Sequence, residues 1–463
     1  MLAQLAQAIR ERRLSTVELV RESLDRIERL DPALNAVTAV WPEEALAEAE
    51  KLDQRGPEGP LAGLPLLVKD NADVAGKLTS YASRTMLDRP PAERSEVTVE
   101  RLVAAGAIPI GRTNLPEFAF QGYTDSKLFG PARNPWGLDW SPGGSSGGSG
   151  AAIAAGLSPI ATAGDGGGSI RTPAAFCGLA GLKPTHGLIG RRPIPSWMDY
   201  STQGPLAATI EDAKLLLHVM RGPADGDPTA APTWQYGGGM PRRVLATLRT
   251  RDVGPLPEDV EEPFRAALAA IEGELGLPVE EISTASLFPS LDLSETQGRD
   301  DWFTTVAAEE LIWLGRAWVR EHLDEFSDDF RSAMEYGLTL TLDDYLEVRQ
   351  HRFAYAADLD RLLGDDTVLV TPTNGYAGWL PNGNLPNGDR PAEAEGYNTG
   401  EFNMSGHPAL SVPAGLSANG IPFGLQVAGP RYRDDLVLEF GAAWEQARPW
   451  PPTAPGYEPF PGP

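Results

Sequence analysis

Two glycine- and serine-rich stretches contain the residues whose types and spacing could carry out chemistry. The first reads Ser-Pro-Gly-Gly-Ser-Ser-Gly-Gly-Ser-Gly over 141–150, and the second reads Gly-Asp-Gly-Gly-Gly-Ser-Ile-Arg over 164–171. A serine hydroxyl becomes a nucleophile once a base removes its proton, and glycine lets the backbone approach a substrate closely. A small-residue helix and one expected strand separate the stretches, so we interpret them as two turns that border one site.

Two other interpretations of these stretches fit less well. A flexible Gly/Ser linker should join two domains, whereas 141–150 runs directly into 151–156, a small-residue segment that must pack tightly. A phosphate-binding Walker loop requires a lysine after its last glycine, and neither stretch supplies one. A non-catalytic, glycine-rich binding scaffold is the alternative from outside the enzymes.

The G-x-S-x-G elbow of α/β-hydrolases is a third interpretation. It fits with either Ser145 or Ser146 as the central residue. His186 or His407 would then complete the catalytic triad. The elbow requires a buried strand immediately before it, and residues 139–142 do not form an apolar strand pattern. A serine–histidine esterase therefore stays open as an alternative.

Several ordered segments of the chain resemble the amidase signature family over nearly its full length. The matching segments are residues 66–71, 111–118, 134–136, 141–149, 165–171, 181–185 and 420–426. Their number, order and spacing make the resemblance specific. It implies an α/β protein with the amidase signature fold, a large mixed β-sheet core sandwiched by α-helices. It also implies a hydrolase that cleaves an amide-type C–N bond through an acyl-enzyme, without a cofactor or metal.

The resemblance implies a catalytic role for three polar side chains. It assigns the nucleophile to Ser169 and the general base to Lys69. Ser145, joined to Gly144 by a cis peptide bond, would relay the proton between them. A lysine can act as a base only when it is neutral, so its pKa must fall well below about 10.4. Burial beyond the apolar residues 66–68 would lower the pKa in this way.

The second stretch would supply the oxyanion hole. The implied donors are the backbone N–H groups of Gly166, Gly167, Gly168 and Ser169, and the loss of one such donor costs roughly 3–4 kcal/mol. Ser146, Asp165 and Arg171 would brace the loop through hydrogen bonds and an ion pair. The family usually has a larger residue at positions 164 and 166, so the two glycines here suggest a looser loop or a wider pocket.

The resemblance also indicates where a substrate could lie. Relatives line their acyl pocket at the positions of Phe118, Phe120 and Gln121, and Trp197 with Met198 is a further candidate. The Asn-, Gly- and Pro-rich segment 374–391 contains Trp379 and is interpreted as a lid. These features favour bulky apolar or aryl substrates, such as anilides and aryl carbamates (urethanes). The alternative within the family is the glutamine-hydrolysing component of an amidotransferase.

The surrounding sequence predicts the elements of an α/β chain. Helical spacing of apolar residues covers 2–30, with a capping box at Ser15–Glu18. The other expected helices are 42–52, 98–105, 209–220 with Thr209 as its cap, most of 242–366, and the C-terminal segment. The expected strands are 64–69, 107–110, 367–370, 409–412 and 423–427, the last two as a hairpin.

We expect a single amidase signature domain over 1–463. Its parts would be N-terminal helices (1–60), the catalytic signature core (61–220), and a helical region with completion of the sheet (241–463), after a linker-like segment at 221–240.

Composition limits the classes of partner. The net charge of −25 disfavours nucleic acid and anionic membranes. A single cysteine, Cys177, excludes an internal disulfide and indicates a buried apolar position. No metal-binding histidine motif occurs. The expected partner is a small amide or carbamate substrate, and the expected state is a cytoplasmic monomer or homodimer.

Overall fold

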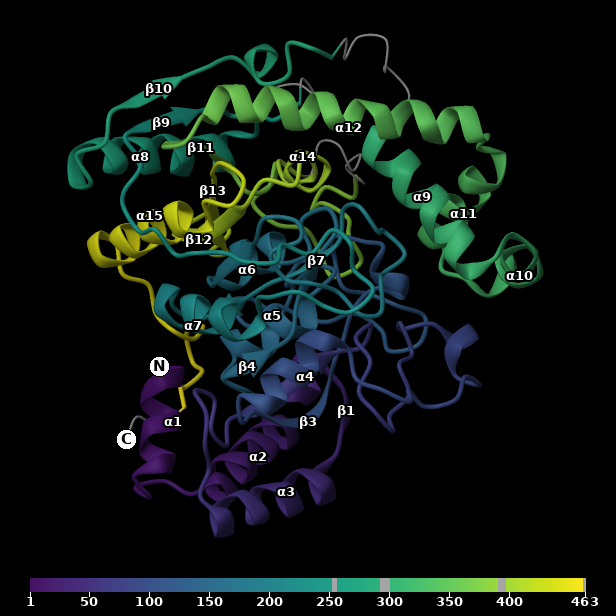
Figure 1. Cartoon of the computed structure of the whole chain (residues 1–463), viewed down its shortest axis with the longest axis vertical. Coiled ribbons are helices and arrows are strands. Elements are labelled where there is room, and N and C mark those ends of the chain that lie inside the picture. Colours follow the sequence, from purple (N-terminus) through teal and green to yellow (C-terminus); the bar gives the residue numbers. More distant parts are fainter. Residues whose placement is uncertain (252–255, 292–299, 390–396, 461–463) are drawn as a thin grey trace.

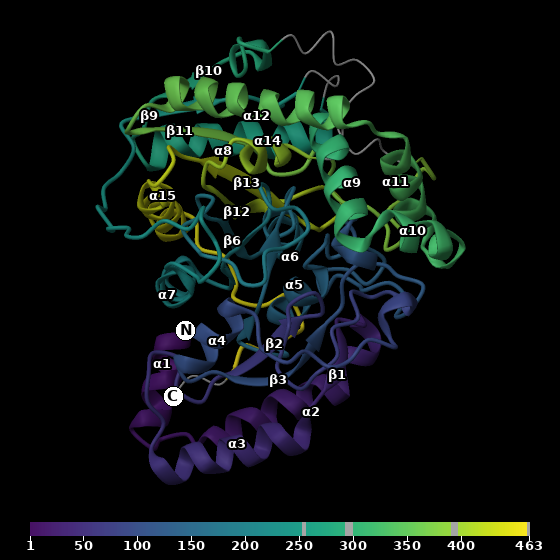
Figure 2. The ribbon, with the colours of Figure 1, turned by 45° about the vertical axis from the view of Figure 1, so that its right-hand side comes forward.

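The protein is described by a computed structural model that covers residues 1–251, 256–291, 300–389 and 397–460. Three helices begin the chain: α1 (Leu2–Arg10), α2 (Thr16–Leu34) and α3 (Pro42–Arg55). Ser15 and Glu18 form the predicted capping box at the start of α2, in which each side chain bonds to the backbone N–H of the other residue. The helices lie together at one end of the molecule (Figures 1 and 2).

A four-stranded sheet lies next to these helices, with the order β1-β3-β2-β4. Its strands are β1 (Val37–Val40), β2 (Pro65–Lys69), β3 (Ile108–Thr113) and β4 (Ile160–Ala161). The central strand β2 is parallel to both of its neighbours, and all five of its residues are buried. Helix α4 (Val97–Ala104) precedes β3. The sheet therefore carries the last residue of β2, Lys69, into the interior of the protein.

A larger mixed sheet of seven strands forms the other half of the core, with the order β10-β9-β11-β13-β12-β6-β8. The strands are β6 (Ala180–Lys183), β8 (Leu206–Ala207), β9 (Arg243–Ala246), β10 (Val279–Glu281), β11 (Thr367–Pro372), β12 (Ala409–Leu416) and β13 (Pro422–Ala428). Strands β12 and β13 form the predicted antiparallel hairpin. Strand β9 is parallel to β10 and β11, whereas the remaining pairs are antiparallel.

Helices cover both sheets. They are α5 (Gly147–Ala154), α6 (Arg171–Cys177), α7 (Ile210–Met220), α8 (Glu258–Glu274), α9 (Asp301–Leu314), α10 (Arg316–His322), α11 (Asp328–Thr339), α12 (Leu342–Leu363), α14 (Gly400–Met404) and α15 (Asp434–Ala447). Figures 1 and 2 show α5 and α6 in the middle of the molecule and α9–α12 at the end opposite α1–α3. The predicted α/β fold, a large mixed sheet flanked by helices, is confirmed.

The predicted elements correspond closely to the observed ones. Thr209 caps α7 by accepting a hydrogen bond from Asp212 N. The region 242–366 is mostly helical, as expected, but its described part also contributes β9 and β10 to the seven-stranded sheet. The predicted loop 374–391 has no helix or strand within 374–389, and residues 390 and 391 lie outside the described residues.

Three further features concern the described residues. None of their helices is both long and apolar enough to cross a membrane. Among them, no three His, Cys, Asp or Glu side chains are arranged to hold a metal ion. Cys177 is buried, and burial raises the pKa of its thiol.

Candidate active site

Lys69 is the charged residue that ends a buried strand. Its backbone N–H donates to Thr162 Oγ1 at 2.8 Å, which ties the end of β2 to the segment after β4. Its Nζ donates a hydrogen bond to Ser145 Oγ at 2.8 Å. The residue is 2% exposed, and burial lowers its pKa to about 7, although the charges of Asp165 and Glu96 oppose the change. A large fraction of Lys69 is therefore neutral near neutral pH.

Ser145 lies just before α5 and follows the one non-proline cis peptide bond found in the described residues, Gly144–Ser145. Gly144 packs against the backbone carbonyls of Gln121 and Tyr123, where a side chain would collide. The hydroxyl of Ser145 is buried and paired with Lys69.

The histidines of the esterase alternative lie elsewhere in the structure. His186 and His407 are both buried. Nε2 of His407 lies 3.3 Å from Asp360 Oδ1. Neither histidine lines the two cavities next to the serines. The geometry therefore favours Lys69 over a histidine as the base at this site.

Ser169 lies between the two-residue strand β5 (Gly164–Asp165), paired with β7 (Thr202–Gln203), and helix α6. Asp165 organises this turn. Its carboxylate accepts from the backbone N–H groups of Gly168 at 2.8 Å and Ile170 at 3.1 Å. It also forms a fully buried ion pair with Arg171 at 2.8 Å. Burial alone would raise the pKa of Asp165, but Arg171 lowers it to about 2, so the carboxylate stays ionised.

The first glycine stretch is bonded directly to the second. The N–H of Ser146 donates to Ser169 O at 3.3 Å, and Ser146 Oγ donates to Gly164 O at 3.3 Å. Ser146, Asp165 and Arg171 thus brace the loop by the bonds expected of them.

The expected oxyanion donors require one correction. The N–H of Gly168 is bonded to Asp165, so it is not available to a substrate. Within the described residues, the N–H groups of Gly166, Gly167 and Ser169 donate to no other group. Gly168 is nevertheless required at its position, because its φ is +141° and a side chain there would collide with Thr399. Unbonded backbone donors beside a serine hydroxyl are what an oxyanion hole needs.

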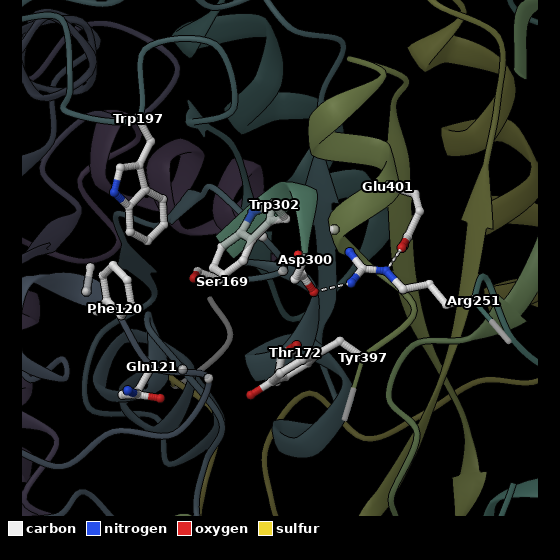
Figure 3. Close-up of a pocket in the computed structure, with 16 residues that line it drawn as sticks. Phe120, Gln121, Ser169, Thr172, Trp197, Arg251, Asp300, Trp302, Tyr397 and Glu401 are labelled. Carbon is white, nitrogen blue, oxygen red and sulfur yellow. Dashed lines mark hydrogen bonds and ion pairs between the residues drawn. The ribbon is translucent and has the colours of Figure 1, made fainter. Parts of the chain in front are cut away.

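Two cavities meet at Ser169. The smaller is open to solvent, contains about 560 Å³ of space, and is lined by Ser169, Gly167 and Gly168 together with aromatic and charged side chains (Figure 3). The larger, of about 1840 Å³ and open to solvent, is lined by Lys69, Ser145 and Ser169. Ser169 is therefore shared, whereas Lys69 and Ser145 line only the larger cavity.

Two tryptophans cover the glycine loop. Trp302 Nε1 donates to Gly166 O at 2.7 Å, and the ring of Trp302 meets that of Trp197 edge-on at 5.6 Å between centroids. A side chain at Gly166 would collide with Trp197, and one at Gly167 would collide with Trp302. The expectation of a wider pocket is wrong at this position, because Trp197 occupies the space that the missing side chain leaves.

The other expected substrate-binding residues have different locations. Phe120, Gln121 and Trp197 line the smaller cavity, and Phe118 and Trp197 line the larger one. Phe120 meets Trp197 edge-on at 5.6 Å. Met198, by contrast, is 43% exposed and lines neither cavity.

Trp379 does not line either cavity, which corrects the expectation that it contacts substrate. It is 2% exposed and packs edge-on against Phe176 at 4.7 Å and Tyr397 at 5.5 Å. Its backbone carbonyl accepts from the N–H of Ser141 at 2.9 Å. Trp379 therefore anchors its loop to the first glycine stretch instead of forming an exposed, mobile lid.

The sequence interpretation missed several residues of the smaller cavity. These are Thr172, Arg251, Asp300, Trp302, Tyr397 and Glu401. Except for Thr172, they come from segments without a recognisable motif.

Comparison with known proteins identifies the family. The model of the Amidase family matches residues 18–438, and the chain therefore belongs to the amidase (amidase signature) family. A glutamyl-tRNA(Gln) amidotransferase component of Cyanothece sp. is 33% identical over 96% of this chain and 98% of its own length. An acylamidase of Rhodococcus erythropolis is 32% identical over 96% of this chain and 95% of its own length.

Solved structures of the family have the same fold. A bacterial aryl acylamidase superposes with a TM-score of 0.86 at 28% identity, over 96% of this chain and 95% of its own. A 6-aminohexanoate cyclic dimer hydrolase complexed with substrate superposes with a TM-score of 0.85 at 28% identity, over 98% of both chains. The chain is thus an amidase signature hydrolase of C–N bonds.

Proposed function

We propose that the protein hydrolyses acylated amines with Ser169 as nucleophile, Ser145 as proton relay and Lys69 as general base. One observation carries the proposal: a fully buried lysine lies 2.8 Å from a serine hydroxyl in the cavity that also contains Ser169. Among the described residues, no carboxylate forms an ion pair with this amine. Its neutral form is the base that a serine nucleophile needs.

The steps follow from this arrangement. Neutral Lys69 takes the proton of Ser145, which takes that of Ser169, while Ser169 Oγ attacks the carbonyl carbon. The oxygen of that carbonyl becomes negative and is stabilised by the N–H groups of Gly167 and Ser169. The proton then returns through Ser145 to the leaving nitrogen, and the C–N bond breaks. A water molecule, deprotonated by the same pair of groups, then attacks the carbonyl carbon of the acyl-enzyme. This step releases the acid and returns the proton to Ser169.

The substrate class we infer is bulky and aryl-bearing. Aromatic side chains line both cavities: Phe120, Trp197, Trp302 and Tyr397 line the smaller, and Tyr81, Phe118, Trp197 and Trp313 line the larger. Aromatic walls favour flat apolar groups through burial and ring contacts. Similarity to an acylamidase and to an aryl acylamidase supports amides of aromatic groups. An aryl carbamate would use the same steps: the amine leaves, and the carbonate ester on Ser169 hydrolyses to an alcohol and carbon dioxide.

A second candidate is glutamine hydrolysis as part of an amidotransferase. The relative from Cyanothece sp., matched over nearly its full length, supports it. The net charge of −25 argues against a surface that handles tRNA.

The test compares four substrates on the purified chain: an anilide, an aryl carbamate, a small aliphatic amide and glutamine. We expect the highest kcat/KM for an aryl substrate. A fluorophosphonate should modify Ser169, as located by peptide mapping. Modification of Ser145 or Ser146 would favour the elbow alternative. Glutamine as the best substrate would favour the amidotransferase role, and no turnover of any substrate would contradict the proposal.

A further inference from the structure

One wall of the smaller cavity is charged, although the other walls are aromatic. Arg251, Asp300 and Glu401 line it together with Trp302 and Ser169. Figure 3 shows the guanidinium of Arg251 between the two carboxylates, on the side of the cavity away from Phe120 and Trp197. Neither the acyl-transfer steps nor the bracing of the glycine loop requires this group.

Arg251 is held in place by both acids. Its Nε binds Glu401 and its Nη1 binds Asp300. Each of the two carboxylates also accepts a hydrogen bond from another residue. Glu401 Oε2 accepts from Thr250 Oγ1 at 2.9 Å, and Asp300 Oδ1 caps helix α9 by accepting from Phe303 N at 3.0 Å. The guanidinium is therefore oriented by groups that cannot easily turn toward a ligand.

One nitrogen of the Arg251 guanidinium, Nη2, remains available to donate a hydrogen bond to a ligand. Among the described residues no acceptor is bonded to Nη2, which lies beside Gly400, where an added Cβ would be 3.3 Å away. A guanidinium has five N–H donors in a rigid plane, and only two of its three nitrogens are bonded here. The cavity thus contains a fixed donor whose position does not depend on the substrate.

The charge balance limits what this donor can bind. One arginine and two carboxylates leave one net negative charge at the cavity wall. A carboxylate on the substrate would gain Arg251 but would face Asp300 and Glu401. A neutral acceptor, such as an amide, ester or ether oxygen, gains the hydrogen bond without that repulsion.

The position of the catalytic groups identifies the part of the substrate concerned. The proton donor must face the leaving nitrogen, and Lys69 and Ser145 line only the larger cavity. The amine therefore leaves through the larger cavity, and the acyl group occupies the smaller one. Resting on the function proposed above, we propose that Arg251 selects acyl groups that carry a second, neutral hydrogen-bond acceptor.

The first experiment measures kcat/KM for benzanilides that differ only on the acyl ring: carbamoyl, methyl or carboxylate, each in meta and para positions. We expect carbamoyl to exceed methyl by about tenfold at one of the positions, as a hydrogen bond to a charged group allows. The carboxylate should be the poorest of the three. The inference would be overturned if kcat/KM were equal for the methyl and carbamoyl substrates at both positions, or if it were highest for a carboxylate substrate. Failure to hydrolyse any benzanilide would instead contradict the proposed function.

The second experiment changes the charge of the wall and keeps its geometry. Asp300→Asn retains a cap for α9, since asparagine caps as well as aspartate, and it retains an acceptor for Arg251. It removes the net negative charge, so the ratio of carboxylate to methyl kcat/KM should rise about tenfold. In Arg251→Met the ratio of carbamoyl to methyl should fall to about one. Unchanged ratios in both variants would show that the charged group is only structural.

Discussion

The glycine-rich centre of the site and the wall of its smaller cavity are built differently. The centre comes from 141–171, and its residues are fixed by steric and hydrogen-bonding demands: glycines where a side chain would collide, and the buried Asp165–Arg171 pair. The wall comes from distant segments, including Arg251, Trp302 and Glu401. We therefore propose that the centre determines the type of reaction and that the wall determines which acyl group is accepted.

The largest expected effect is at the centre. Ser169→Ala should lower kcat/KM for every substrate by about 10⁴-fold or more, because no group replaces the nucleophile. Its Tm should stay close to that of the wild type, since Ser169 lies at a cavity and is only partly buried. Residual turnover with an unchanged ranking of substrates would show that another residue is the nucleophile.

Lys69→Met should lower kcat on anilides by about 10²–10⁴-fold, the range that a general base contributes. Methionine has a similar length and no charge, so the buried site stays filled. The loss on an activated ester should be much smaller, because a phenolate leaving group needs no proton. Equal losses on both substrates would indicate that Lys69 only holds Ser145 in place.

Trp302→Phe tests the wall. It keeps an aromatic ring and removes the bond to Gly166 O, so kcat/KM on anilides should fall about tenfold and the ranking of substrates should change. Trp450→Phe is the matched control, because Trp450 Nε1 also donates to a backbone carbonyl, that of Ala208 at 2.9 Å, and lines neither of these cavities. The control should lose a similar amount of stability and no activity. If Trp302→Phe and Trp450→Phe lowered kcat/KM equally, the wall of the cavity would have no special role in activity.

The smallest expected effect is a shift in pH dependence. Wild-type kcat/KM should rise as the pH increases through about 7, because Lys69 is a base only after its ammonium loses a proton. The negative charge of Glu96 raises the pKa of Lys69. Glu96→Gln should therefore move the rise to lower pH. A shift to higher pH, or none, measured from full pH profiles, would show that Lys69 does not set the rise.

The sequence predicted the centre well and the wall poorly, for physical reasons. Buried strands, caps and glycine turns are local, so Lys69 at the end of β2 and Thr209 at the cap of α7 could be predicted. Trp379 was misinterpreted because a tryptophan in a loop of glycines can face solvent or anchor the loop, and only its contacts with Phe176 and Tyr397 distinguish the two.

The same limit applies to the glycine at position 166. The absence of a side chain there suggested free space, but the space is filled by a ring from Trp197. Contacts between residues far apart in the sequence leave no local pattern, and Arg251 with its two acids is the clearest example.

The anchoring of Arg171 has a consequence for how the chain assembles. Besides Asp165, its guanidinium donates to Thr399 O, Asn403 Oδ1 and Gln426 Oε1, which are 228, 232 and 255 residues further along the chain. Contacts at such separations form late, because the intervening segment must first be closed into a loop. During synthesis the turn that carries Ser169 therefore lacks three of its hydrogen bonds until the chain as far as Gln426 has emerged. A nascent chain that ends before this segment should thus be inactive.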